Sequence, residues 1–198
     1  MKRRKPGKTL IVGYGNPLRS DDGFGWHVTR GLVQALAGCE VEVMSCRQLT
    51  PEIAEPLSRC QFAIFLDADS RGTPGKLHCR TVHPASPTVE ALTHRCTPAY
   101  LLASAEKLYG SRPRAVTLTV SAQTFAFGEK LSPVVSAALA GAVKRVRYLV
   151  GAAQTSLRER SLIPESESRP LAAIRRLPQI KKGGDRYGQR RCKKRQDR

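Results

Sequence analysis

The sequence predicts an α/β fold, a three-layer sandwich in which a five-stranded, mostly parallel sheet is flanked by helices on both faces. Short apolar runs rich in β-branched residues alternate along the chain with segments whose apolar residues recur at helical spacing. This alternation is typical of parallel strands joined by helices that cover the sheet. The first such run, residues 10–12, is followed by a glycine-containing turn and then by an apolar-periodic segment.

The first half of the chain yields three strands and two helices. A buried strand at 10–12 precedes a helix over 26–37, which ends at Gly38. Apolar residues alternate in a second strand over 41–46, and Thr50-Pro51-Glu52 opens a short helix through Leu57. Residues 61–66 form a third, fully buried strand, which ends at Asp67-Ala68-Asp69.

The second half supplies the remaining elements. After the turn cluster at 71–75, residues 76–82 are expected to form a strand at the sheet edge. Thr97-Pro98 starts a helix that Gly110 closes, and residues 116–120 form the fifth strand. Ser132-Pro133 starts a last helix, which we expect to end at Val150.

Charge is concentrated at the two ends of the chain. The 198 residues carry a net charge of +18, half of it in residues 151–198, which hold 14 Lys/Arg and 5 Asp/Glu. We therefore expect a basic N-terminal arm (1–7), one domain (8–152) and a disordered basic tail (153–198), too poor in apolar residues to fold alone. The tail has no assigned chemistry, and any binding of nucleic acid would go through it alone.

The remaining composition favours a cytoplasmic protein, with a monomer as the preferred oligomeric state. The six cysteines show no CxxC spacing, which argues against a structural zinc site. We find no apolar signal-peptide region before the first strand and no run of about 18 apolar residues that would span a membrane.

The turn after the first strand resembles a dinucleotide-binding loop only superficially. A GxGxxG motif would need glycine at position 18, which is Leu, and the adjacent Asp21 and Asp22 would repel a pyrophosphate. Acidic groups at this place suit a cation better.

Polar side chains follow the first and third strands, and a histidine precedes the third helix. Asp21/Asp22, Asp67/Asp69 and His94 could meet at one edge of the sheet, since the carboxyl ends of parallel strands converge there. Two carboxylates and an imidazole suit a divalent first-row metal. Plain structural roles stay open: Asp21 as a helix cap, Asp69 as a turn residue, and His94 as a solvated loop residue.

Four segments in order resemble the hydrogenase maturation endopeptidase family, over about residues 8–150. They are GYGNPLRSDDGFG, LDAD followed by GTPG, THRCTPAYLL and FGEKLSP. The resemblance implies an aspartic-type endopeptidase that removes the C-terminal extension of a nickel–iron hydrogenase large-subunit precursor after nickel insertion. It places the metal-binding positions on Asp22, Asp67 and His94, with nickel carried by the substrate. Arg95-Cys96, where the family commonly has a small or apolar pair, is a departure.

The catalytic group and two other function classes stay open. Asp22 and Asp67 are the candidate catalytic residues, either through the metal as Lewis acid or through an aspartate as general base. Cys96 is a weaker nucleophile candidate, and His83 ranks below His94 as a ligand. His27 and His78 are expected to pack or face solvent. The alternatives are a non-catalytic metal- or precursor-binding module, and nucleic-acid binding through the tail.

Overall fold

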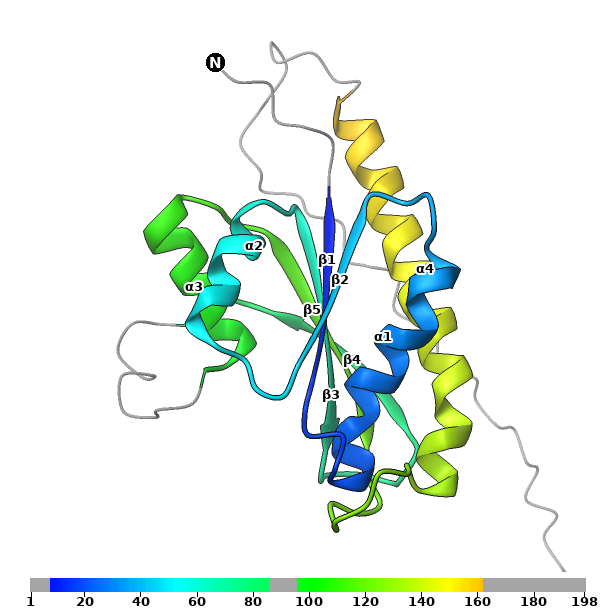
Figure 1. The fold of residues 1–198 in the computed structure, drawn as a ribbon. Helices are drawn as coiled ribbons and strands as arrows, with labels where there is room; N and C mark the ends of the chain where they lie inside the picture. The colour runs from blue at the N-terminus through cyan, green and yellow to red at the C-terminus, as the bar shows by residue number, and fades with distance from the viewer. Residues whose placement is uncertain (1–7, 86–95, 162–198) are drawn as a thin grey trace, which may run out of the picture. The chain divides into compact units, whose positions relative to one another are not determined.

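The computed structural model describes residues 8–85 and 96–161, with side chains up to residue 155. Five strands form one sheet in the order β2-β1-β3-β5-β4 (Figure 1). Their bounds are β1 Thr9–Tyr14, β2 Val41–Cys46, β3 Phe62–Asp69, β4 Leu77–Val82 and β5 Arg114–Ser121. The pairs β1–β2, β1–β3 and β3–β5 are parallel, and β4 pairs antiparallel with β5 at the edge. The predicted α/β fold and the edge position of residues 76–82 are confirmed.

Helices cover both faces of this sheet. Helices α1 (Phe24–Ala35) and α4 (Pro133–Ser161) lie side by side on one face, and α2 (Ala54–Ser58) and α3 (Pro98–Tyr109) lie on the other (Figure 1). Two short 3₁₀ turns, η1 (Ser20–Gly23) and η2 (Pro51–Ile53), precede α1 and α2.

Each face has its own apolar core, because the buried residues of the central strands alternate between the two sides. Ile11, Ile64 and Leu118 pack against α1 and α4, whereas Leu10, Val12 and Phe65 pack against α2 and α3. The three residues Phe65, Ile64 and Ile11 are fully buried. This double covering explains why β1 and β3 read as unbroken apolar runs in the sequence.

The last helix is longer than predicted. We expected an end at Val150, but α4 continues to Ser161, and Ala153 is still buried against the core. Residues 151–161 contain Ala, Gln, Leu, Arg and Glu, which favour helix, and the next proline is Pro164. Falling hydrophobicity therefore did not mark the helix end. None of the described helices is long and apolar enough to cross a membrane.

Candidate functional site

The turn after β1 lies where three backbone segments pass unusually close together. A Cβ on Gly13 would lie 2.3 Å from the carbonyl oxygen of Gly25, and one on Gly25 would lie 2.6 Å from that of Leu66. Only glycine allows the start of α1 to approach both β1 and β3 this closely. The two glycines thus bring the residues around η1 to the carboxyl end of β3.

Asp22 is held in this turn by a backbone hydrogen bond. The Asn16 N–H donates to Asp22 Oδ2 at 2.8 Å, and the Trp26 indole N–H donates to the carbonyl oxygens of Gly15 and Cys46, each at 3.0 Å. Trp26 therefore fixes the turn to the end of β2. The Asn16 bond engages one oxygen of the carboxylate, which has capacity for further partners.

Asp67 lies beside Tyr14 at the same edge of the sheet. Gly13 pairs with Leu66, so the residues that follow them are neighbours, and the Tyr14 hydroxyl donates to the Asp67 carboxylate. Asp67 Oδ1 also accepts from the Ala68 N–H at 2.8 Å. The sequence singled out Asp67 but missed Tyr14, whose only signal is its place at the end of a buried strand.

The pKa of the Asp67 carboxyl is raised to about 6. Burial is the largest cause, the Tyr14 and Ala68 hydrogen bonds oppose the rise, and the charges of Asp22 and Asp69 add to it. Burial, followed by the Asp67 charge, likewise raises the pKa of Tyr14 well above its usual range. The pair therefore consists of a protonated phenol and a carboxylate that titrates near neutral pH.

Asp22 and Asp67 are thus near enough, at the carboxyl ends of β1 and β3, for the charge of Asp22 to act on Asp67. Two carboxylates in this arrangement can bind a cation or accept a proton. His94, the predicted third ligand, lies outside the described residues. Within 8–85 and 96–161, no three His, Cys, Asp or Glu side chains gather to hold a metal.

Asp21 has a different role from its neighbour. It is fully buried and accepts hydrogen bonds from the Gln123 and Thr124 N–H groups and from both the N–H and the hydroxyl of Ser132, at 2.7–3.1 Å. These partners lie more than 100 residues away, in the segment between β5 and α4. Asp21 is therefore a structural anchor, which the sequence did not reveal.

The other acidic and histidine candidates make contacts of their own, although the charge of Asp69 still acts on Asp67. Asp69 makes an exposed bidentate pair with Arg71. His83 is exposed near the opposite end of the strands from Asp67. β4 runs antiparallel, and its last residue, Val82, pairs with Ala115 near the start of β5. His78 contacts the Ser121 hydroxyl at 3.3 Å, and that hydroxyl donates to the Arg71 carbonyl.

Cys96 directly precedes the start of α3, where the Thr97 hydroxyl accepts from the Tyr100 N–H and caps the helix. The Cys96 side chain packs against the apolar core on the α2/α3 face. This agrees with a packing residue at the helix entry.

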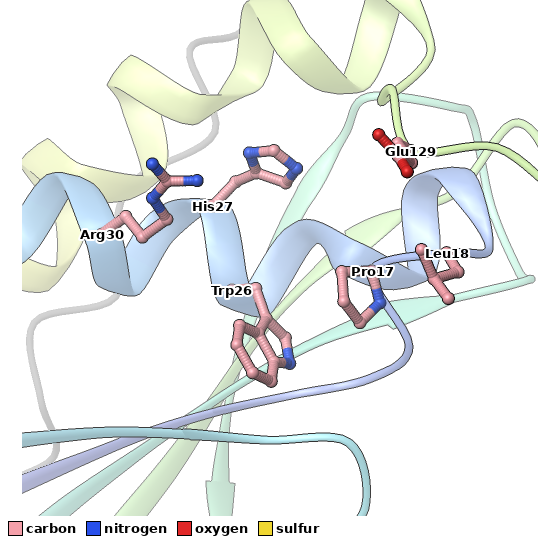
Figure 2. Close-up of a pocket in the computed structure, with 6 residues that line it drawn as sticks. All are labelled: Pro17, Leu18, Trp26, His27, Arg30 and Glu129. Atoms are coloured by element: carbon pink, nitrogen blue, oxygen red, sulfur yellow. The ribbon is translucent and has the colours of Figure 1, made fainter.

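A shallow pocket opens on the α1 side of the turn (Figure 2). It is lined by the apolar surfaces of Pro17, Leu18 and Trp26, with His27, Arg30 and Glu129 around it. Burial, with the neighbouring Arg30 charge, lowers the pKa of His27. A neutral imidazole therefore predominates there at pH 7, and the pocket carries one cation and one anion.

No family model and no curated protein matches this sequence. Solved structures do. The hydrogenase maturating endopeptidase HybD from E. coli matches with 24% identity and a TM-score of 0.58, over 81% of this chain and 99% of that one. The hydrogenase maturation protease HycI from Thermococcus kodakarensis KOD1 has 19% identity and a TM-score of 0.60, over 74% and 94%.

A third match is the hydrogenase 2 maturation peptidase from Thaumarchaeota archaeon SCGC_AB-539-E09, with 24% identity and a TM-score of 0.56, over 73% of this chain and 98% of that one. All three matches cover nearly the whole of the other chain. The chain therefore has the fold of the hydrogenase maturation endopeptidases.

Proposed function

We propose that this protein is an endopeptidase that removes the C-terminal extension of a nickel–iron hydrogenase large-subunit precursor after nickel insertion. The observation that supports the proposal is the proximity of Asp22 and Asp67, at the carboxyl ends of β1 and β3, in a chain with this fold. Nickel in this reaction belongs to the substrate. We place the reaction in the cytoplasm, as the cysteine pattern and the sequence composition predict.

In this mechanism Asp22 and Asp67 bind the nickel of the precursor together with His94. Carboxylate and imidazole donors suit a divalent metal of this kind. Recognition of the metal by the protease would restrict cleavage to precursors whose assembly is complete. The same contact holds the peptide next to the carboxylates, so that positioning contributes to the rate.

Asp67 is also suited to proton transfer. A carboxyl with a pKa of about 6 is mostly ionised at pH 7 yet basic enough to accept a proton from an attacking water. The Tyr14 hydroxyl, held protonated, hydrogen-bonds to the Asp67 carboxylate and so helps to orient it. Asp67 is therefore the stronger of the two candidates for general base.

The test is incubation of the full chain with nickel-loaded and nickel-free precursor of a hydrogenase large subunit from the same genome, followed by mass spectrometry of the subunit. We expect trimming of the nickel-loaded form alone. No trimming by the unaltered protein would reject the proposed function.

Site variants test the assignment separately. Asp22→Ala, Asp67→Ala and His94→Ala should keep the circular dichroism spectrum and stop trimming. Asp69→Ala is the matched control, because this neighbouring carboxylate pairs with Arg71 at the surface, and it should remain active. Normal trimming by all three site variants would show that the ligand set is wrong while leaving the activity in place.

A further inference from the structure

A loop at the same edge of the sheet is fastened to the residues just before Asp22. We call residues 122–132, between β5 and α4, the rim loop. Its backbone exchanges hydrogen bonds with Leu18 and Ser20: Gly128 N–H donates to Leu18 O at 3.0 Å, and Ser20 N–H donates to Gly128 O at 2.7 Å. The Ser20 hydroxyl also donates to the Ala126 carbonyl at 3.1 Å.

Further bonds hold the loop on both sides of this pair. The Arg19 Nε–H donates to the Phe125 carbonyl at 3.2 Å, and the Asp21 carboxylate accepts the bonds from Gln123, Thr124 and Ser132 described above. Six of the eleven residues of the rim loop (123–126, 128 and 132) are therefore bonded to residues 18–21. Such bonding limits the conformational freedom of the loop.

The fastened loop presents an aromatic ring to solvent. Phe127 is 91% exposed, the highest value among the large hydrophobic residues that the structure describes, and Leu18, bonded to the adjacent Gly128, is 43% exposed. An isolated exposed apolar residue needs no explanation. Here, however, the two exposed apolar side chains belong to backbone segments that are hydrogen-bonded to each other.

Their position points to the partner. Leu18 lies four residues before Asp22, and Figure 1 shows the rim loop at the edge where β1 and β3 end. A protein whose peptide bond reaches Asp22 and Asp67 must lie over this edge. Arg19, which bonds to the Phe125 carbonyl, and Lys130 of the rim loop are both exposed, and Glu129 is the one acid of the rim loop, so this surface favours a partner with an acidic border.

We propose that Phe127, supported by Leu18, is the anchor through which this protein binds the folded large-subunit precursor, inserting into an apolar pocket with an acidic border. The proposal rests on the function proposed above. Aromatic anchors carry a large share of interface binding energy, and a preorganised loop avoids the entropy lost when a flexible one is ordered. The contact lies outside the reacting groups, so it acts on binding of substrate and transition state alike.

The test compares Phe127→Ala with Leu108→Ala in the full chain. Leu108, 67% exposed near the end of α3, is the matched control for loss of an exposed apolar side chain. For trimming of nickel-loaded precursor, we expect Phe127→Ala to raise KM about tenfold or more with kcat within twofold, and Leu108→Ala to change neither. Phe127→Leu should recover part of the loss.

Binding is measured separately with the Asp67→Ala protein, with and without Phe127→Ala, by calorimetry with the same precursor. A Kd weakened about tenfold by Phe127→Ala supports the contact even if the chain proves not to cleave. An unchanged KM and Kd overturn the proposal. So does a change in oligomeric state on ultracentrifugation of Phe127→Ala, because the ring would then contact a second copy of the chain.

Discussion

The Tyr14 hydroxyl donates a hydrogen bond to the Asp67 carboxylate, and so joins the carboxyl ends of β1 and β3. Both side chains are partly buried, and the bond gives each a polar partner inside the protein. The bond favours the charged form of Asp67 and partly offsets the effect of burial on its pKa. Tyr14 is therefore a positioning residue for the candidate site.

Tyr14→Phe should raise the pKa of Asp67 above its value of about 6, because the variant removes the hydroxyl that stabilises the carboxylate. Carbon-13 NMR titration of the Asp67 carboxyl measures this directly. Tyr109→Phe, at a half-exposed position at the end of α3, is the control and should leave the titration unchanged. A pKa unaltered in Tyr14→Phe would mean that the hydroxyl contributes little to the carboxylate.

Asp67→Asn should stabilise the protein at neutral pH and much less at low pH. The folded-state pKa of Asp67 lies above the unfolded value of about 3.9. The contribution of Asp67 to wild-type stability is therefore fully present below pH 4 and is lost as the pH rises through about 6. The asparagine escapes this loss, which is about 2–3 kcal/mol at most.

Thermal unfolding between pH 4 and pH 8 provides the measurement. The melting temperature of Asp67→Asn relative to wild type should rise by several degrees across this range. Asp69→Asn should show no such rise across this range, because the Arg71 partner lowers the pKa of Asp69 and so places its titration below pH 4. A melting-temperature difference between Asp67→Asn and wild type that does not change with pH would show that burial of the charged carboxylate at position 67 costs no stability.

The sequence predicted the sheet well because its signals are local. Apolar runs such as Phe62–Leu66, turn residues such as Gly110, and the Thr97 cap act within a few residues of the element that they define. The end of α4 was missed because helix propensity outlasts the apolar stripe that was used to predict it.

The candidate site was predicted in part for a similar reason. Asp22 comes after β1 and Asp67 lies near the carboxyl end of β3, and parallel topology brings these strand ends together. The distinct role of Asp21 depends on Gln123 and Ser132, more than 100 residues away. No local pattern encodes such a contact, and adjacent aspartates look equivalent in a sequence.

Asp21→Asn should therefore mainly reduce the stability of the protein, whereas Asp22→Asn should mainly reduce its activity. The Asp21 carboxylate accepts four hydrogen bonds in a fully buried position, and an amide NH₂ would face donors there, so we expect a loss of about 2–4 kcal/mol in the free energy of unfolding. Asp22→Asn can keep its single bond from Asn16 and should lose less than about 1 kcal/mol while abolishing precursor trimming.

Urea unfolding of both variants and trimming assays on the folded fractions distinguish the two roles. If Asp21→Asn were as stable as Asp22→Asn, the bonds to the rim loop would contribute little to the fold. If the Asp22→Asn protein trims the precursor at the normal rate, Asp22 is not a functional residue of the candidate site.

Gly15→Ala should disrupt the turn more than its backbone conformation alone explains. Gly15 has φ of 127°, and an added Cβ would lie 2.0 Å from the carbonyl oxygen of Asp22, a backbone atom that cannot move without displacing η1. Gly110 has φ of 64°, but a Cβ there would meet no atom within 4 Å. Gly110→Ala therefore reports the conformational cost alone, about 1–2 kcal/mol.

We expect Gly15→Ala to lose more than about 3 kcal/mol in urea unfolding, since steric overlap adds to the conformational cost. It should also abolish trimming at temperatures where the variant is still folded, because the turn that carries Asp22 must shift. Equal losses in the two variants would mean that the turn relaxes freely around an added methyl group. In that case the close approach of Gly15 to Asp22 would not be what holds this carboxylate beside Asp67.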